Sequence, residues 1–99
     1  MKDIIFGLNK AFENRIRLGI MSVLMVNEEI DFNALKEMLN ITDGNLASHA
    51  SALEKLKYIE VRKQFIGKKP NTTYSATSTG KTAFNNHLNY LEKLIQNKS

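Results

Sequence analysis

The side chains that most clearly suggest a chemical role are small polar residues along one predicted helix, from Thr42 to about Leu56. At about 100° per residue, Leu46, Ala50 and Leu53 form its buried stripe, and the opposite face is small and polar. Small side chains let a helix approach a groove closely, and hydroxyl and amide groups bond to phosphates or base edges. The alternative is a partly buried helix that packs its small face on another helix. The candidate contact residues of this helix are Thr42, Asn45, Ser48, His49, Ser51 and Lys55.

The positive charge of the chain is concentrated at the end of this helix and just after it. The chain has 14 Lys and Arg against 10 Asp and Glu, a net charge of +4 and a pI near 9.4. Residues 55–69 alone carry +5, and the rest of the chain carries −1. Such a local excess favours a polyanionic partner, whereas an even spread would mainly favour solubility. The basic residues of this segment are Lys55, Lys57, Arg62, Lys63, Lys68 and Lys69.

Three residues in this region have two interpretations each. His49 lies about 60° to 70° from the apolar stripe, so it either shelters at the core edge with one nitrogen bonded or contacts a base or phosphate. Asp43 serves the positive end of the helix or accepts from a cytosine amine. Arg62 contacts a nucleic-acid backbone or pairs with Glu60 or Glu54.

Two helix-start patterns in succession position the polar helix. Asp31 is a predicted N-cap before Phe32, Leu35 and Leu39, which recur at helical spacing, and this helix should end near Asn40. Thr42 then caps the polar helix itself, with Ile41 and Leu46 at the positions of a hydrophobic staple. Two short helices joined by a tight turn predict a helix-turn-helix over residues 31–56.

A β-hairpin is predicted to follow. Residues 58–66 alternate with period two, with Ile59, Val61 and Phe65 on one face and Lys63 as the one mismatch. Residues 67–71 form the turn and residues 72–76 a second short strand. The hairpin must pack against the helices because an isolated one is marginally stable, and its basic end should project beyond them.

Apolar stripes at the two ends of the chain predict a dimer face. One lies within a predicted helix over residues 3–12, and the other in a closing helix from Thr77 to about Gln96, while a central helix over residues 14–26 supplies core. A chain of 99 residues has limited core to cover both stripes, although they could also pack on each other within one chain. The predicted interface residues are Ile4, Ile5, Leu8, Phe84, Leu88, Leu91, Leu94 and Ile95.

Composition excludes several classes of protein. Without cysteine, disulfide scaffolds, thiolate zinc sites and thiol switches are impossible, and two distant histidines, His49 and His87, do not suggest a metal site. The longest apolar stretch, residues 18–26, is too short for a membrane span, and Asp3 and Lys10 interrupt any signal-peptide core. The absence of a nucleophile with its base, a phosphate-binding glycine loop or a carboxylate cluster argues against an enzyme. We therefore expect a cytoplasmic binding protein with no cofactor, no metal and no membrane partner.

Most of the chain resembles the small MarR/ArsR-like winged-helix transcriptional regulators. The segments N-R-I-R-L-G-I-M, F-N-A-L-K and T-S-T-G-K-T-A-F are similar to that family, and the more specific ones are T-D-G-N-L-A-S-H, L-E-K-L-K-Y-I and G-K-K-P-N-T-T-Y. The resemblance implies a mainly α fold with a small β-hairpin: one domain over residues 1–99, a wing over 58–77, and dimerisation helices over 1–13 and 78–97. The thiolate metal-sensing motif of many ArsR-type repressors has no counterpart, and the chain is shorter than a typical MarR protein.

The resemblance also implies a partner and a site. The expected function is that of a homodimer on duplex DNA, with each recognition helix in a major groove and each wing near a flanking minor groove. Residues that match the recognition helix are Thr42, Asp43, Gly44, Asn45, Ser48 and His49, and those that match the wing are Lys68, Lys69, Asn71 and Thr72. The alternative function is a protein-interaction module whose basic wing meets an acidic partner.

Overall fold

The computed structural model describes residues 2–96 as a mainly helical domain with a small antiparallel sheet. The N-terminal part comprises α1 (Lys2–Gly7), a 3-10 helix η1 (Lys10–Phe12) and α2 (Arg15–Val26). Then follow β1 (Ile30–Asp31), α3 (Phe32–Leu39), α4 (Asp43–Lys55), β2 (Ile59–Ile66), β3 (Lys69–Ala76) and α5 (Ser78–Gln96). Residues 1 and 97, the outer bounds of the two expected dimerisation helices, lie outside the described residues.

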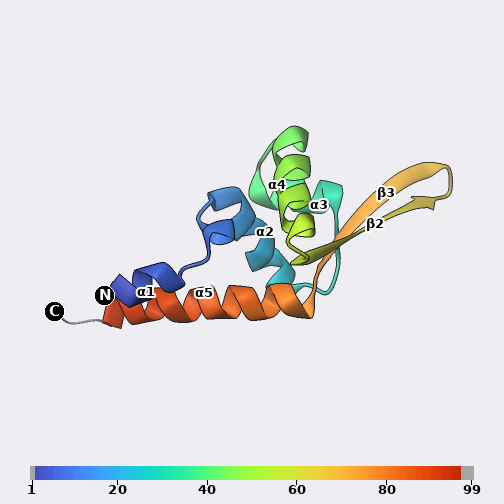
Figure 1. The fold of residues 1–99 in the computed structure, drawn as a ribbon. Helices are drawn as coiled ribbons and strands as arrows, with labels where there is room; N and C mark the ends of the chain where they lie inside the picture. The colour runs from blue at the N-terminus through green and yellow to red at the C-terminus, as the bar shows by residue number, and fades with distance from the viewer. Residues whose placement is uncertain (1, 97–99) are drawn as a thin grey trace.

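The molecule is long and thin, with extents of 59 × 25 × 21 Å. Helix α1 lies beside the C-terminal half of α5 at one end, and the β2–β3 hairpin, called the wing below, projects from the other end (Figure 1). The core lies between them, where α2 crosses α3, α4 and the base of the sheet. Its fully buried side chains include Ile20, Met21, Leu24, Leu35, Leu46, Leu53 and Ile59.

The helix-turn-helix forms where the capping residues predict it. The Asp31 carboxylate accepts from the Ala34 N–H at 2.8 Å, and Asn40 ends α3 in the left-handed region with φ of 52°. The Thr42 hydroxyl then accepts from the Asn45 N–H at 3.1 Å to begin α4. Because these contacts satisfy backbone groups left free at helix ends, local sequence is enough to place both helices.

The N-terminal helix differs from its prediction. The expected continuous helix over residues 3–12 breaks after Gly7, and Asn9 begins η1 by accepting from the Ala11 N–H at 2.9 Å. A side chain at Gly7 would collide with the ring of Tyr90, so the glycine allows α1 to lie against α5. The break turns Phe12 into the core, where it is 2% exposed.

The sheet is also larger than predicted. It has three strands in the order β1-β3-β2, all antiparallel, and the two-residue strand β1 was not expected. The turn is shorter than predicted, since Gly67 takes a positive φ of 65° and β3 already starts at Lys69. Pro70 is tolerated within β3 because β1 pairs only with Thr73 and Tyr74, which leaves the other edge of β3 free at Pro70.

One member of the predicted dimer face belongs to the core instead. Phe84 is 4% exposed, and its ring lies edge-on to that of Phe12 with centroids 5.1 Å apart. In α5 the inner face also carries Gly80, whose backbone touches the Tyr58 carbonyl so closely that a Cβ would overlap it. The apolar residues of α5 therefore divide between an inner and an outer face. Those that stay exposed on the outer face are Leu88, Leu91 and Ile95.

Candidate nucleic-acid interface

Helix α4 presents the polar face that its sequence predicts. Leu46, Ala50 and Leu53 are buried, which fixes the rotation of the helix about its axis. The residues thereby turned outward and exposed are Thr42, Asn45, Ser48, Ser51 and Lys55. The opposing face thus carries hydroxyl, amide and ammonium groups. It packs on no other helix within residues 2–96, although the alternative interpretation would have required such packing.

His49 is held at the edge of the core by a residue that sequence reasoning missed. Its Nδ1 lies 3.1 Å from Nη1 of Arg17, and Nε of Arg17 donates to the Ala11 carbonyl at 2.6 Å. Because a guanidinium only donates, Nδ1 must accept, and the proton of a neutral ring is then on Nε2. His49 can therefore donate, but not accept, through its second nitrogen. The sequence signal that could have identified Arg17 is the pair of arginines, Arg15 and Arg17, in the first turn of α2.

Asp43 acts within the protein. Its carboxylate lies 2.8 Å from Nζ of Lys36, and the pair joins the end of α3 to the first turn of α4. The negative charge also suits the positive end of the α4 dipole. This geometry favours the helix-start role of Asp43 over contact with a cytosine amine.

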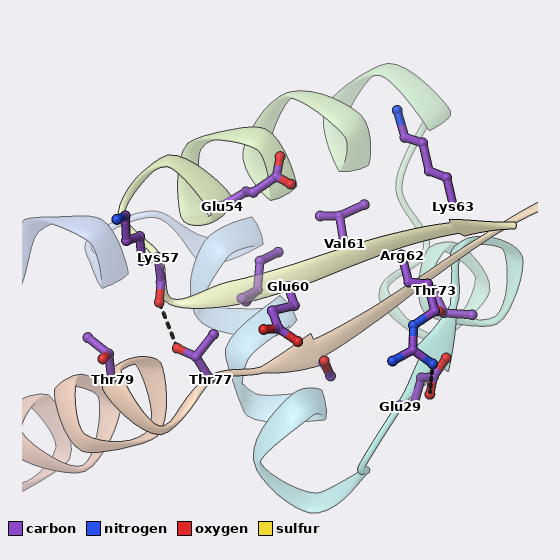
Figure 2. Close-up of a pocket in the computed structure, with 12 residues that line it drawn as sticks. Glu29, Glu54, Lys57, Glu60, Val61, Arg62, Lys63, Thr73, Thr77 and Thr79 are labelled. Carbon is purple, nitrogen blue, oxygen red and sulfur yellow. Dashed lines mark hydrogen bonds and ion pairs between the residues drawn. The ribbon is translucent and has the colours of Figure 1, made fainter.

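The ion pair that was the alternative role of Arg62 forms with a different carboxylate. Nη1 of Arg62 lies 3.9 Å from the Glu29 carboxylate, and no ion pair with Glu60 or Glu54 forms among the described residues. The unpredicted strand β1 explains the difference, because it brings the residue before Ile30 alongside the sheet. Figure 2 shows Arg62 and Glu29 on one side of β2, with Val61 and Lys63 on the side of α4.

A groove of about 560 Å³ separates α4 from the wing. Its floor includes the aromatic rings of Phe32 and Tyr74, whose centroids are 6.5 Å apart, and burial raises the pKa of Tyr74, with the Glu54 charge adding to the rise. Ser51 of α4 and Lys63 of β2 also line it. Lys63, the one mismatch in the strand pattern, is thus placed in the groove between the helix and the wing.

Lys63 faces α4 because of the strand register. It pairs with Thr72, which also lines the groove. The other wing residues that sequence analysis selected divide by exposure: Lys68 and Lys69 are exposed at the tip, whereas Asn71 and Thr72 are partly covered. A ligand lying along the groove would meet Ser51, Lys63 and Thr72 together and the two tip lysines only if it extends outward along the wing.

A second groove, of about 760 Å³, lies at the base of the wing (Figure 2). Acidic Glu29, Glu54 and Glu60 line it together with basic residues, so it lacks the uniform positive charge that a polyanion favours. Thr73 at its edge is 7% exposed, and its hydroxyl has no hydrogen-bond partner in the described structure. Glu54 also lines the groove beside α4, so charge alone does not separate the two grooves. The groove beside α4 is the better candidate for nucleic acid because Ser51, on the exposed polar face of α4, borders it.

His87 has a structural role. It is 4% exposed, its Nδ1 accepts from the Asn9 N–H at 3.0 Å, and its ring packs edge-on against Phe12. Burial lowers the pKa of His87, and the Glu13 charge opposes that shift in part. In residues 2–96, no three His, Asp or Glu side chains gather as a metal site would need, and no helix is long and apolar enough to cross a membrane.

Three comparisons relate the chain to known proteins, and two of them identify its fold. A family model described as a winged helix DNA-binding domain matches residues 16–95. An uncharacterized protein of Methanocaldococcus jannaschii is 36% identical over 88 residues, which make up 89% of this chain and 96% of the relative. A transcriptional regulator homologue from Pyrococcus horikoshii OT3 is 29% identical with a TM-score of 0.84, over 96% of this chain and 92% of that one.

A more distant solved structure shares the fold alone. Diamide-treated YodB from B. subtilis is 19% identical with a TM-score of 0.77, over 90% of this chain and 87% of that one. The winged-helix fold predicted by resemblance is therefore confirmed, and the matching family is one of DNA-binding domains and not of enzymes. With its helix-turn-helix, its basic hairpin and a family match over residues 16–95, the chain belongs to the winged helix DNA-binding domains.

Proposed function

We propose that this protein is a sequence-specific transcriptional regulator that binds duplex DNA as a homodimer, with α4 in the major groove and the wing along the flanking backbone and minor groove. The observation that carries the proposal is the exposed polar face of α4 beside the groove that contains Ser51, Lys63 and Thr72. The similarity to a solved transcriptional regulator homologue, at 29% identity, supports a role in transcription.

Each part of this surface has a distinct chemical task. Asn45 and Ser48, exposed in the first half of α4, would bond to base edges, because side-chain amides and hydroxyls both donate and accept. His49 would donate from Nε2, since its Nδ1 is engaged by Arg17. The ammonium groups of Lys55 and Lys63 would neutralise phosphates, which positions the helix without selecting a sequence. The remaining proposed phosphate and sugar contacts are Thr42, Ser51, Arg62, Lys68, Lys69, Asn71 and Thr72.

The dimer part of the proposal rests on apolar side chains left uncovered along α1 and α5. Phe6 is 78% exposed and Ile95 is 86% exposed, while Leu88 and Leu91 are 42% and 38% exposed. A second copy that covers this face would remove from water a set of side chains on two adjacent helices. Ile5 is 50% exposed on α1 and belongs to the same proposed interface.

The other predicted interface residues contribute less. Ile4, Leu8 and Leu94 are already partly covered within one chain, because α1 packs on α5. The two apolar stripes therefore cover each other in part within one chain, which was the alternative to a dimer face. In the proposed dimer the two α4 helices would stand about 34 Å apart and bind an inverted repeat.

Light scattering tests the dimer. Wild-type protein should give the mass of two chains at micromolar concentration, and Leu88→Glu should give the mass of one, because it places a charge in the proposed interface. Ser22→Glu, exposed on α2, is the matched control and should stay dimeric. A single-chain mass for the wild type would contradict the dimer.

Selection from a random duplex pool followed by gel shifts tests sequence-specific binding. Enrichment of an inverted repeat is expected, with affinity that falls steeply as salt increases, because several phosphates per subunit are neutralised. Unselective binding would contradict the assignment of base contacts to α4. Binding that does not vary with salt would contradict the role of the basic segment and favour a protein-interaction module.

A further inference from the structure

The outer end of the wing carries apolar side chains that the described chain leaves uncovered. Phe65 is 74% exposed and Ile66 is 63% exposed, although both belong to a regular strand. At the other end of the same hairpin, Ile59 and Tyr74 are only 2% and 3% exposed, because they pack on the core. Figure 1 shows that the hairpin extends well past α3 and α4, so none of the described helices or strands covers its tip.

The strand register organises this tip. Phe65 pairs with Pro70 across the hairpin and, at two-residue spacing, shares a face with Val61 and Lys63, the face directed at α4. Ile66 pairs with Lys69 and lies on the opposite face. The tip therefore has an apolar side chain on each face, and the cations at Lys63, Lys68 and Lys69 lie around it.

This combination suits one part of a nucleic acid. Cations flanking an exposed apolar end are complementary to the two phosphate backbones that border a minor groove, and apolar side chains that enter the groove insert between base pairs. Single exposed apolar residues are ordinary on protein surfaces, but these two are adjacent and stand at the far end of a basic arm.

We propose that Phe65 and Ile66 form a wedge that enters the minor groove beside the segment bound by α4 and partly unstacks one base step. This inference rests on the proposed DNA-binding function and adds a mode of sequence selection to it. Unstacking is easiest at flexible pyrimidine–purine steps such as TA. The protein would therefore prefer such a step under the wing tip without any hydrogen bond to its bases.

A single tryptophan provides the test, because the natural chain has none. In Phe65→Trp the indole should be quenched when the duplex is added, and its accessibility to acrylamide should fall several-fold, because it stacks between bases. Val26→Trp is the matched control, since Val26 is 82% exposed at the end of α2 and lies outside the proposed interface. A gel shift on the same samples measures the complex independently.

Phe65→Ala tests the same proposal through the loss of DNA affinity. Base–aromatic stacking is worth an affinity change of about 5-fold to 150-fold per ring. Binding of the homodimer to a duplex with TA under both wing tips should therefore weaken by about that factor for each subunit, and the preference for TA over GC there should disappear. The salt dependence should stay unchanged, because no cation is removed. A 2-aminopurine placed in the TA step should brighten with the wild type and not with Phe65→Ala.

The outcomes separate this inference from the function on which it rests. If a complex forms but the indole of Phe65→Trp stays accessible to acrylamide and the 2-aminopurine fluorescence does not rise, the wedge is overturned. The proposed DNA binding is then unaffected. No complex with any duplex overturns both. Protection of the indole by vesicles of anionic phospholipid, but not by duplex, also overturns the wedge and assigns the tip to a membrane surface.

Discussion

Removing the two wing-tip lysines should change how DNA affinity depends on salt. Lys68 and Lys69 are exposed at the end of the wing, and no ion pair involves them within residues 2–96. In a homodimer the double substitution Lys68→Ala/Lys69→Ala removes four charges. If all four neutralise phosphates, the slope of log affinity against log salt should become shallower by about 3.6, at about 0.9 per contact.

The same relation gives the size of the affinity loss. Extrapolated from 1 M salt, four lost contacts weaken binding about 4,000-fold at 0.1 M and about 80-fold at 0.3 M, whereas one lost contact per subunit gives about 60-fold and about 9-fold. The assay is fluorescence anisotropy of a labelled duplex at several salt concentrations. The difference in slope between the wild type and the variant gives the number of phosphate contacts that the wing tip makes.

A control with equal charge loss makes this result specific. Lys2→Ala/Lys81→Ala removes two exposed cations from α1 and α5, outside the proposed contact surface, and should leave the slope nearly unchanged. The reasoning would be refuted if both double variants lowered affinity equally, because net charge alone would then explain the effect. It would also be refuted if the wing variant kept the wild-type slope.

Three further predictions concern stability and are all measured by urea unfolding. Gly80→Ala should destabilise the fold by more than about 1 kcal/mol, because its Cβ would overlap the Tyr58 carbonyl; a neutral result would contradict the packing of α5 there. Thr73→Val should leave stability unchanged or raise it by about 1 kcal/mol, since the lost hydroxyl has no partner, and a clear loss would show that the hydroxyl is bonded. Burial lowers the pKa of His87, and the charge of Glu13 only partly opposes that shift, so below about pH 6.5 the unfolded chain binds more protons than the folded chain. Stability should therefore fall as the pH drops below that value. His87→Gln should flatten this pH dependence, and an unchanged pH profile would contradict the reasoning.

The helices that the sequence alone predicted correctly are those whose starts depend on contacts between residues three or four positions apart in the chain. The side chains of Asp31 and Thr42 each bond to an N–H three residues ahead, so the starts of α3 and α4 follow from local chemistry. The buried stripe of α4 then fixes which residues face outward. This explains why most of the candidate interface could be named before any tertiary contact was known.

The features that sequence missed depend on residues far apart in the chain. Strand β1 exists only because Ile30 and Asp31 meet Tyr74 and Thr73, and two residues without a repeating pattern predict no strand. The Glu29 partner of Arg62 follows from that pairing. The contact of Arg17 with His49 similarly joins positions 32 residues apart. Such pairings are set by how helices and strands assemble, which local patterns do not encode.

Periodicity also identifies a face without showing what covers it. Phe84 and Leu88 belong to one apolar stripe in sequence, yet Phe84 is 4% exposed and Leu88 is 42% exposed, because Phe12 covers only the first. The alternation in β2 likewise places Ile59 and Phe65 on one face, but the hairpin extends beyond the core, so Phe65 is exposed to solvent. A face that periodicity predicts and the fold leaves uncovered is therefore where partners are best sought: a second chain at Leu88 and a DNA base step at Phe65.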